Sequence, residues 1–520
     1  MTRSRPRHLR RSLAYATTTV ALTAAALIGL PGTSQAAGPL PCDIYASGGT
    51  PCVAAHSTTR ALFAAYNGNL YQVRRASDNT TRNIGLLAAG DYANAASQDS
   101  FCANTTCVIT IIYDQTSRHN DLTPAPPGGV GGQDSPVPAD ALPVTAGGHI
   151  VYGTSFSGRM GYRDNSTSGI ATGSQPEGMY AVMSGTHFNS GCCFDYGNAE
   201  TNNLDNGNGH MDAIYFGTLC WFAPCNGGGP WVMAALENGL FQSNTGGSQN
   251  ASYTGNRNPY VTTTLKNNGV NFFAIKDGNA QSGGLATRFS GALPVPPFRS
   301  GYSPMHLEGA IILGIGGDNS NSAIGSFFEG VMVAGVPSDA TENAVQANIV
   351  SVGYGGPSPV AAGTLNPGST ISLRATTACC TTRYIRHQNN NAVTSVITSG
   401  SSAVDKGDST WIVRRGLASN SCVSFESRNF PGDFLRHQNF QLRRQPMDGT
   451  ALFRADATFC PQAGQSGQGT SFAAFNFPTR FLRHFNNTLY IASNGGPNSF
   501  DSATSWAADV SWIVSSPWTP

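Results

Sequence analysis

The chain has 520 residues, with 30 lysines and arginines against 29 aspartates and glutamates, and charged residues make up only 11% of it. Average globular chains carry roughly 25% charged residues, whereas this chain has 61 glycines and takes much of its polarity from Asn, Ser and Thr. This balance gives no electrostatic reason to expect nucleic acid or an anionic membrane as a partner, and it is typical of an extracellular, β-rich protein with many turns.

The first 37 residues read as a secretory signal peptide. Five arginines precede an apolar run, and small residues surround an expected cleavage site near Ala37. The leader holds five of the 30 basic residues and no acidic residue, so the mature chain carries 25 basic against 29 acidic residues. No later stretch is long and apolar enough to span a bilayer. We therefore expect a secreted, extracellular protein.

Residues 38–354 alternate short apolar runs with loops rich in Gly, Asn and Pro. The runs are "TCVITIIY", "GMYAVM", "WVMAAL", "AIILGIGG" and "GVMVAG". Strands at this density predict an all-β fold, with a β-sandwich in this region. Helices are expected only at "PCVAAHSTTRALFAAY" and "TENAVQANIVSV". Residues 355–370, "GGPSPVAAGTLNPGST", read as a linker.

Residues 371–520 contain three repeats. "TTRYIRH", "PGDFLRH" and "PTRFLRH" end at His387, His437 and His484, which are 50 and 47 residues apart. Each is followed by an Asp, two small or variable residues and an aromatic residue, and these Asp residues are Asp408, Asp456 and Asp509. Three strand-rich units of about 50 residues predict a β-trefoil.

The repeated His and Asp have two interpretations. Together they can hydrogen-bond the hydroxyls of a sugar, while an aromatic side chain packs on its apolar face. Alternatively, they form a buried pair that holds each repeat together. Because one weak pocket copied three times gains avidity on a polymer, the repetition in a secreted protein favours carbohydrate binding.

Twelve cysteines in an exported chain predict disulfides. Short spacings suggest the local pairs Cys42–Cys52, Cys102–Cys107, Cys220–Cys225, Cys192–Cys193 and Cys379–Cys380, and by elimination Cys422 pairs with Cys460. A disulfide between neighbours closes no loop in the unfolded chain and adds little stability, so the pair in "GCCFDY" points to function. CxxC pairs and clustered histidines are absent from the sequence, so no metal and no other cofactor is expected.

The remaining candidates for chemistry are carboxylates, because the sequence has no GxSxG or HExxH motif and no phosphate-binding glycine loop. Those in unusual contexts are Asp195, Glu200, Asp212, Glu237, Asp318 and Glu329. Glu237 follows an apolar strand in "GPWVMAALENGLF", and Asp318 follows another in "AIILGIGGDNSNS". Two carboxylates that flank a bond are sufficient to hydrolyse a glycoside, although composition alone does not select this pair.

Longer motifs select among these residues. "PCDIYASGGTPCVAAHSTTRALF", "FCANTTCVITIIYDQTS", "SGCCFDYGNAET", "NGHMDAIYFG", "GPWVMAALENGLF" and "EGAIILGIGGDNSN" together resemble family 54 glycoside hydrolases, which are secreted α-L-arabinofuranosidases. The C-terminal repeats resemble the arabinose-binding trefoil of carbohydrate-binding module family 42. The resemblance follows nearly the whole mature chain in order.

The resemblance implies a retaining exo-hydrolase that removes terminal arabinofuranosyl side chains from plant arabinoxylan or arabinan. It implies that Glu237 is the nucleophile and Asp318 the general acid/base. The Cys192–Cys193 disulfide would form the floor of the sugar pocket, Trp221 its aromatic wall, and Asn238 and the Gly317 backbone its hydrogen-bond partners. The candidate sugar-binding residues of the module are His387, Asp408, His437, Phe440, Asp456, His484 and Asp509.

Three features depart from the family pattern. The pattern has an Asp two residues before the nucleophile, where this chain has Ala235, which leaves the preferred sugar open. Cys220–Cys225 is an added bridge beside Trp221. The first repeat keeps both His387 and Asp408, so we expect all three repeats to bind sugar.

Two other functions therefore stay open. The chain could hydrolyse another furanoside, such as galactofuranose or D-arabinofuranose, or act on β-xylose as a side activity. It could also be a non-catalytic polysaccharide-binding protein, although it keeps both carboxylates of the expected pair. A monomer is the default expectation for a secreted enzyme that works on a polymer.

Overall fold

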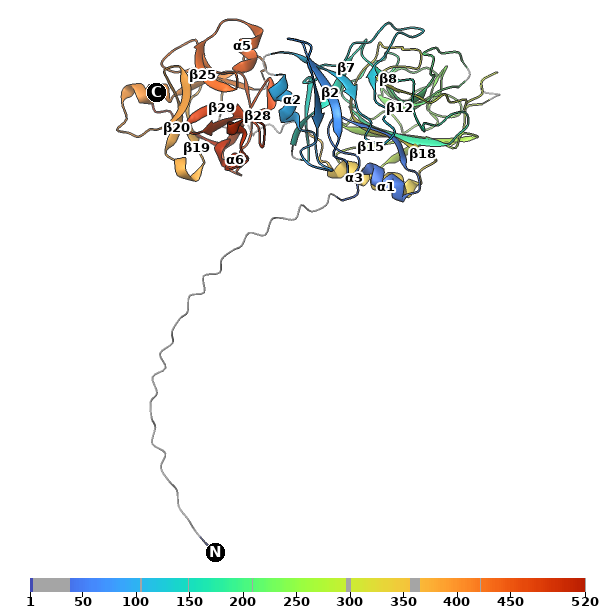
Figure 1. The fold of residues 1–520 in the computed structure, drawn as a ribbon, viewed down its shortest axis with the longest axis horizontal. Helices are drawn as coiled ribbons and strands as arrows, with labels where there is room; N and C mark the ends of the chain where they lie inside the picture. Colours follow the sequence, from blue (N-terminus) through green and yellow to red (C-terminus); the bar gives the residue numbers. More distant parts are fainter. Residues whose placement is uncertain are drawn as a thin grey trace. The chain divides into compact units, whose positions relative to one another are not determined.

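The computed structural model describes residues 1–2, 38–102, 105–147, 149–207, 209–295, 301–355, 365–420 and 422–519 (Figure 1). Residues 3–37 of the predicted signal peptide and most of the predicted linker lie outside these residues. Regular structure in the described chain is mostly strand, as the sequence predicts. No helix among these residues is long and apolar enough to cross a membrane.

Strands between residues 38 and 355 form two large antiparallel sheets and a small one. The eight-stranded sheet contains β16 (Ala286–Ala292), β15 (Phe272–Asn279), β14 (Val261–Asn267), β9 (Glu177–Met183), β18 (Ile324–Ala334), β7 (His149–Ser157) and β6 (Leu142–Ala146), with β1 (Cys52–Ser57) paired to β18. The seven-stranded sheet contains β13 (Leu240–Phe241), β12 (Trp231–Ala235), β11 (Asp212–Gly217), β10 (Asp195–Ala199), β17 (Ala310–Leu313), β8 (Tyr162–Asp164) and β5 (Thr123–Pro124). The small sheet contains β3 (Thr81–Gly85), β2 (Asn69–Arg75) and β4 (Cys107–Ile112).

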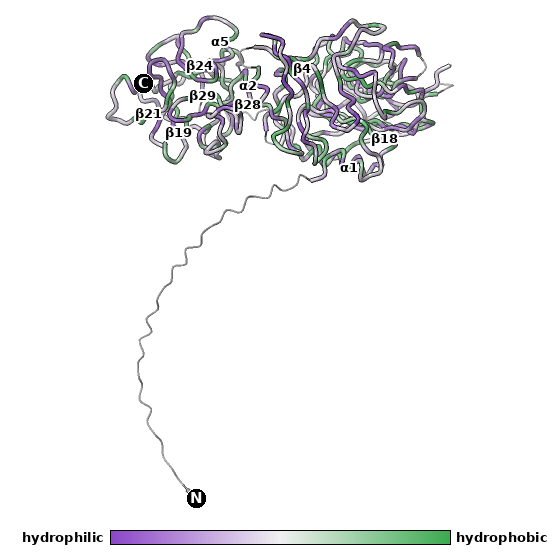
Figure 2. The backbone as a smooth tube through the Cα atoms, in the orientation of Figure 1, coloured by the Kyte–Doolittle hydropathy of each residue, from purple (hydrophilic) through white to green (hydrophobic). Residues whose placement is uncertain are grey.

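Side chains of the two large sheets meet in a shared core. Tyr196 of β10 hydrogen-bonds His56 of β1 at 3.1 Å, and its ring lies 5.3 Å from that of Phe327 in β18. Neighbouring residues of a strand point to opposite faces. Asp195, next to Tyr196, therefore projects toward the outer face of the seven-stranded sheet. In Figure 2, hydrophobic and hydrophilic stretches alternate at short intervals along the backbone, as expected for strands with one face in the core.

One of the two predicted helices is confirmed and the other is wrong. The segment "TENAVQANIVSV" falls in α3 (Asp339–Ser351), which Ser338 caps by accepting a hydrogen bond from the Thr341 backbone. The first residues of "PCVAAHSTTRALFAAY" instead form strand β1, in which all residues after Cys52 are buried. A surface helix needs a polar face, and this segment is enclosed beside β18.

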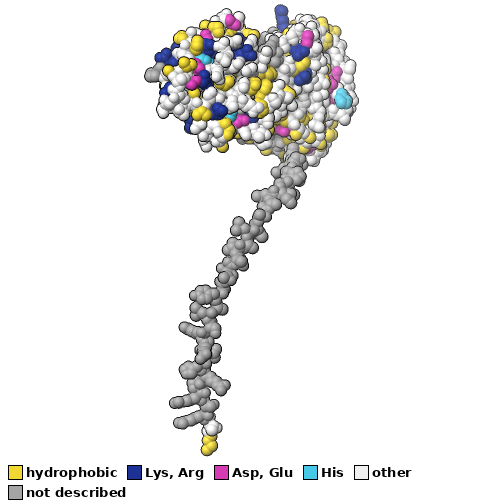
Figure 3. All heavy atoms as spheres, turned by 60° about the vertical axis from the view of Figure 1, so that its left-hand side comes forward, with side chains coloured by type: hydrophobic (Ala, Val, Ile, Leu, Met, Phe, Trp, Pro, Cys, Tyr) yellow, Lys and Arg dark blue, Asp and Glu magenta, His cyan; other side chains and the backbone are white. Residues whose placement is uncertain are grey.

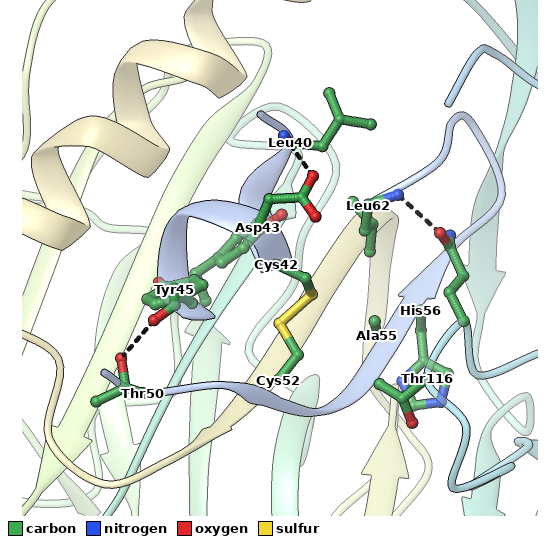
Figure 4. The surroundings of a disulfide bond; sticks show 12 residues. Leu40, Cys42, Asp43, Tyr45, Thr50, Cys52, Ala55, His56, Leu62 and Thr116 are labelled. Atoms are coloured by element: carbon green, nitrogen blue, oxygen red, sulfur yellow. Dashed lines mark hydrogen bonds between the residues drawn. A yellow bond between two sulfur atoms is a disulfide. The ribbon is translucent and has the colours of Figure 1, made fainter. Parts of the chain in front are cut away.

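Disulfide Cys42–Cys52 joins the start of β1 to α1 (Pro41–Ser47), a helix that the sequence analysis did not predict (Figure 4). Pro41 begins the helix, and the Asp43 carboxylate accepts a hydrogen bond from the Leu40 backbone at 3.0 Å. Figure 1 shows α1 beside α3. All six predicted disulfides are confirmed in the described residues.

The C-terminal region repeats one unit three times. Each unit is a hairpin, then a short helix, then a strand. The hairpins are β20–β21 (Arg383–Gln388, Asn391–Val396), β24–β25 (Asp433–Gln438, Gln441–Pro446) and β28–β29 (Phe477–Phe485, Thr488–Ala492). The helices are α4 (Ala403–Asp408), α5 (Ala451–Asp456) and α6 (Trp506–Asp509). The following strands are β22 (Trp411–Arg415), β26 (Phe459–Ala463) and β30 (Trp512–Ser515), and the other strands are β19 (Thr370–Ala375), β23 (Val423–Ser427) and β27 (Thr470–Ala474).

The repeats share a hydrophobic core, and strands from the two ends of the region pair with each other. β30, the last strand, pairs with β19, the first, and with β27. Trp411 and Trp512, the aromatic residues that end two of the repeated motifs, are fully buried in this core. The face of the molecule in Figure 3 carries scattered charged side chains among many uncharged ones, in keeping with the low charge content of the sequence.

A buried ion pair links three parts of the N-terminal region. The Arg60 guanidinium donates to Glu329 of β18 through Nε and Nη2 at 2.5 and 2.6 Å, and through Nη1 to Asn348 of α3. Tyr180 and Tyr354 also donate to the Glu329 carboxylate, at 2.9 and 2.7 Å. Glu329, one of the six carboxylates singled out in the sequence, is therefore a structural residue at the centre of the eight-stranded sheet.

We expect Glu329→Gln to destabilise the protein by roughly 3–5 kcal/mol, because it leaves the Arg60 guanidinium buried without its counter-charge. Urea unfolding measures this change. The matched control is Asp78→Asn, which removes the exposed Arg75–Asp78 pair and should leave the unfolding midpoint unchanged. Equal midpoints for Glu329→Gln and wild type would contradict the structural role.

Candidate active site

The structure brings all seven residues predicted for the catalytic pocket together in one cavity. It lies against the seven-stranded sheet, and its lining comes from β10, β12 and β13, from the segment before β10, and from the loops that follow β10, β11, β12 and β17. Its lining includes Cys192, Cys193, Asp195, Asp205, Met211, Trp221, Ala235, Glu237, Asn238, Gly317, Asp318 and Ser320. These residues come from segments more than 100 positions apart in the chain, so the fold alone assembles the cavity.

Glu237 stands in the tight turn that joins β12 to β13. The turn consists of Glu237 and Asn238, which both have positive φ angles, 54° and 51°, and the Leu236 backbone N–H donates to Gly239. Two consecutive positive φ angles are typical of a type I′ hairpin turn, which Asn and Gly favour and Glu does not. This costly placement directs the Glu237 carboxylate off the end of the strand and into the cavity.

The loop before β11 surrounds the Glu237 carboxylate with donors. Asn206 and Gly207 donate their backbone N–H groups to Oε1 at 2.7 Å each, and His210 donates its own to Oε2 at 2.8 Å. The His210 ring nitrogen Nδ1 lies 3.1 Å from Oε2. Burial by itself would raise the pKa of Glu237, but these three hydrogen bonds and the nearby histidine lower it below its ordinary value. Glu237 is therefore ionised over the physiological pH range.

Asp318 lies on the loop that follows β17. Its Oδ1 accepts a hydrogen bond from the Ser320 backbone at 2.9 Å and another from the Ser320 hydroxyl. Its backbone carbonyl accepts from Val130 at 3.0 Å. One carboxylate oxygen is thus held by Ser320, which fixes the orientation of the group at the cavity.

The Cys192–Cys193 pair is tied to the same loop. Cys193 donates its backbone N–H to Ser320 at 3.1 Å, and Ser322 donates its own to Cys192 at 3.0 Å. These bonds place the disulfide of the adjacent cysteines against the segment that carries Asp318. The sulfur surface and the carboxylate therefore form one rigid wall of the cavity.

Position 317 leaves no room for a side chain larger than that of glycine without a shift of its neighbours. A Cβ atom there would lie 1.9 Å from Oε2 of Glu200. Glu200 is fully buried, and neither of its carboxyl oxygens has a hydrogen-bond partner among the described residues. Burial, followed by the charge of Glu237, raises the pKa of Glu200 to about 8. Glu200 is therefore a neutral acid below the Gly317–Asp318 loop at physiological pH.

The aromatic side chain expected at the cavity lies at its edge. Trp221 is 47% exposed and belongs to the loop between β11 and β12, which Cys220–Cys225 closes. An exposed ring beside a small cavity is placed to pack against the part of a substrate that extends out of it.

A carboxylate that the sequence analysis did not select also lines the cavity. Asp205 lies on the loop that donates to Glu237, and burial together with the Glu237 charge raises its pKa to about 6. It brings a carboxyl group into a cavity where Ala235 offers only a methyl group. The Asp before "NGNGH" was its only sequence signal.

The other selected carboxylates have different positions. Asp195 lines the cavity with its carboxyl oxygens buried, and burial, with Asp318 as the next contribution, raises its pKa well above the ordinary value. Asp212 lies in the core and accepts a hydrogen bond from Asn267. Burial raises the pKa of Asp212 to about 7.

In the C-terminal region, every repeat brings its His and its Asp together. The Nε2 to Oδ1 distances are 3.4 Å for His387–Asp408, 3.4 Å for His437–Asp456 and 3.6 Å for His484–Asp509. Each Asp is the last residue of the short helix and also accepts a hydrogen bond from the arginine that precedes the histidine, Arg386, Arg436 or Arg483. We call these pairs the first, second and third His–Asp sites.

A side chain from another loop connects the His to the Asp in each of the three pairs. The sequence analysis did not predict any of these three residues. Asn429, Asn476 and Thr377 each accept from the histidine Nε2 and donate to Oδ1 of the Asp, with distances of 2.7–3.0 Å. Burial lowers the pKa of all three histidines, so they are neutral. The repeated "NFP" before two of the hairpins was the available signal.

Phenylalanine rings stand beside the first two sites. Phe430 lies 5.4 Å from His387 and Phe477 lies 5.3 Å from His437, both edge to face. Phe440, which the sequence analysis named for the second repeat, packs edge to face against Phe477 at 5.5 Å. It therefore supports the ring that contacts His437.

Comparisons with known proteins agree on one family. A family model described as alpha-L-arabinofuranosidase B, catalytic, matches residues 41–355, and one described as the alpha-L-arabinofuranosidase B (ABFB) domain matches residues 373–514. A probable alpha-L-arabinofuranosidase B of Aspergillus clavatus is 55% identical over 94% of this chain and 97% of its own length. A protein of Trichoderma koningii named arabinofuranosidase/B-xylosidase is 55% identical over 93% of this chain and 96% of its own length.

Solved structures give the same result. An arabinofuranosidase complexed with arabinofuranosyl-alpha-1,2-xylobiose is 50% identical, covers 92% of this chain and 100% of its own, and has a TM-score of 0.60. A GH54 a-l-arabinofuranosidase soaked with a cyclic sulfate inhibitor has the same identity, coverage and TM-score.

We expect Glu200→Gln to flatten the pH dependence of stability. In the unfolded chain a Glu has a pKa near ~4.3, so between about pH 4 and pH 8 the folded protein binds more protons and loses stability as the pH rises. For Glu200 this loss is on the order of 4 kcal/mol, and the neutral amide removes it. Unfolding free energies measured at pH 5 and pH 8 test this expectation.

The control for this experiment is Glu308→Gln. Glu308 is a partly exposed carboxylate that accepts from Thr201, next to Glu200 in the chain. This variant should keep the wild-type pH dependence. If the Glu200→Gln and wild-type curves run parallel from pH 5 to pH 8, Glu200 is not the buried neutral acid described here.

Proposed function

The chain belongs to the α-L-arabinofuranosidase B family, family 54 of the glycoside hydrolases, and we propose that it is a secreted, retaining enzyme with Glu237 as nucleophile and Asp318 as general acid/base. It is a glycoside hydrolase that cleaves α-L-arabinofuranosides. The observation that carries the residue assignment is the Glu237 carboxylate, which three backbone N–H groups keep ionised in the same cavity as Asp318.

In the first step, Glu237 attacks the anomeric carbon of the bound arabinofuranose. The bond to the leaving oxygen breaks as Asp318 donates its proton to that oxygen, and a covalent glycosyl–enzyme ester forms on Glu237. The fixed hydrogen bonds on Oε1 and Oε2 stabilise the carboxylate before the attack and as the leaving group of the second step.

In the second step, Asp318 acts as a base. It removes a proton from a water molecule, whose oxygen attacks the anomeric carbon and releases Glu237 as the carboxylate. Two displacements at one carbon return the original configuration, and both carboxylates end in their starting protonation states. Retaining enzymes hold the two carboxyl groups ~5–5.5 Å apart, and the shared cavity supports this arrangement.

The proposed substrate is a terminal arabinofuranosyl side chain of arabinoxylan or arabinan. The cavity is small and has the Cys192–Cys193 pair in its lining, which suits one terminal sugar, while the exposed Trp221 ring is available to the rest of the polymer. The arabinofuranosyl-xylobiose bound by a 50% identical structure supports a xylan side chain. β-Xylosidase activity is the second candidate, because the T. koningii relative carries both names.

The proposed organisation is a signal peptide at 1–37, a β-sandwich catalytic domain at 38–354, a linker at 355–370 and a β-trefoil at 371–520. Contacts between the two large sheets support the sandwich. The threefold repetition of hairpin, helix and strand, with the first strand paired to the last, supports the trefoil.

The three His–Asp sites are the proposed binding sites of the module. Each has a neutral histidine and an aspartate that a bridging residue orients, and two have a phenylalanine alongside. The six His and Asp side chains are nearly buried, which is also the geometry expected for purely structural pairs. Binding and stability measurements on the same variants separate the two roles.

We expect Glu237→Gln to reduce hydrolysis of 4-nitrophenyl α-L-arabinofuranoside to below about a thousandth of the wild-type rate, because it removes the nucleophile. Asp318→Ala should lose less on this activated substrate than on an arabinofuranosyl xylo-oligosaccharide, since nitrophenolate leaves without a proton. Azide, which attacks without a general base, should restore turnover of Asp318→Ala and yield the arabinosyl azide.

Asp78→Asn, a remote acid-to-amide change, is the control and should keep full activity. Proton NMR of the first product gives the stereochemistry. Retention predicts that the α-arabinose appears first, and initial β-arabinose would reject the double displacement. Azide rescue of Glu237→Gln in place of Asp318→Ala would reverse the assigned roles.

We expect Asp408→Ala to weaken binding to arabinan. This result would show that the first His–Asp site binds sugar. The measurement is affinity electrophoresis of the full chain with Glu237→Gln, which prevents turnover, and Asp456→Ala and Asp509→Ala provide matched variants for the other sites. A loss of affinity at unchanged melting temperature supports binding. A lower melting temperature at unchanged affinity would make the first pair structural.

A further inference from the structure

The second pair of adjacent cysteines occupies a defined place in the threefold repeat. In the first two His–Asp sites, the bridging asparagine is followed directly by the phenylalanine that contacts the histidine. Phe430 and Phe477 each stand seven residues before the histidine of the hairpin that follows, His437 and His484. Cys380 stands seven residues before His387, at the corresponding point of the loop that completes the third site.

The loop of the third site contains no aromatic residue. Between β19 and β20 it reads "TTACCTT", and Thr377 in it bridges His484 and Asp509 at 2.8 Å each. Cys380 closes a single turn on Thr377, because its backbone N–H donates to the Thr377 carbonyl at 2.7 Å. The disulfide is therefore held within one turn of the residue that touches both members of the pair.

We propose that the Cys379–Cys380 disulfide is the apolar wall of the third His–Asp site, in the place that Phe430 and Phe477 hold in the other two. Its exposure fits this role. Cys379 is exposed, and Cys380 is half-buried and packs against the core of the region, as Phe477 does. This inference rests on the proposed function of the His–Asp sites.

The chemistry of a disulfide suits such a wall. Its sulfur atoms are apolar and polarisable and form no strong hydrogen bonds, so they pack against the C–H face of a sugar while His484 and Asp509 take its hydroxyls. The same chain already lines the catalytic cavity with Cys192–Cys193. A compact sulfur wall is smaller than a phenylalanine ring, and the ligand is a terminal furanose of the same polymer that the catalytic cavity takes.

The test isolates the third site in the full chain. In a Glu237→Gln, Asp408→Ala, Asp456→Ala background, only the third site contributes to arabinan binding beyond the catalytic cavity, and adding Asp509→Ala gives the baseline. We expect Cys379→Ser with Cys380→Ser to weaken binding in affinity electrophoresis by about five-fold or more, toward this baseline. Cys379→Ser with Cys380→Phe should recover part of the loss, because it supplies the ring of the other sites.

A matched background separates a wall from a fold defect. With Glu237→Gln, Asp408→Ala and Asp509→Ala, binding depends on the second site, and the double serine change should leave it unaltered. Equal losses in both backgrounds, or no loss in the third-site background, would overturn the proposal. If Asp509→Ala itself changes nothing, the third site does not bind, and the proposed function of that site falls together with its wall.

Discussion

Carboxyl groups gathered in one cavity repel each other once they are ionised, and the catalytic site is built around this constraint. Five of them, Glu237, Asp318, Asp205, Asp195 and Glu200, lie in or directly below it. Burial raises the pKa of Asp205, Asp195 and Glu200, so these groups tend to keep their protons. Around Glu237, by contrast, the backbone supplies three donors, which together with His210 lower its pKa. Negative charge in the cavity is thereby favoured on Glu237, the proposed nucleophile.

The two sheets supply the rigidity that this arrangement requires. Glu237 occupies an unfavourable turn conformation, and the position is maintained because β12 is paired on both sides and buried. The Arg60–Glu329 pair holds the opposite sheet to α3 at a distance from the chemistry. Loops on a fixed scaffold can then carry Asp318, Cys192 and Cys193 in a constant relation to Glu237.

The three His–Asp sites of the C-terminal region share one hydrogen-bonding arrangement, with small variations. In each site a neutral histidine, a bridging side chain and an aspartate form a hydrogen-bonded chain, and an arginine neutralises the aspartate. The bridge comes from the following unit and, for the third site, from the loop after β19 at the start of the region. A site can therefore form only when neighbouring units are packed together, which couples each His–Asp site to the folded region as a whole.

Local patterns in the sequence determined the strands, α3, the three repeats and five of the six disulfides, because short apolar runs, a capped polar segment and closely spaced cysteines each act over a few residues. Elimination assigned the sixth disulfide, Cys422–Cys460. The resemblance to a family pointed to Glu237 and Asp318, which composition did not single out. Tertiary structure alone decided that "PCVAAHS" is a strand, since its burial beside β18 overrides its helical pattern. It also decided which carboxyls are charged and which residues bridge the His–Asp pairs. Burial and contacts between residues 20 to 132 positions apart set these properties, and no local window of the sequence contains them.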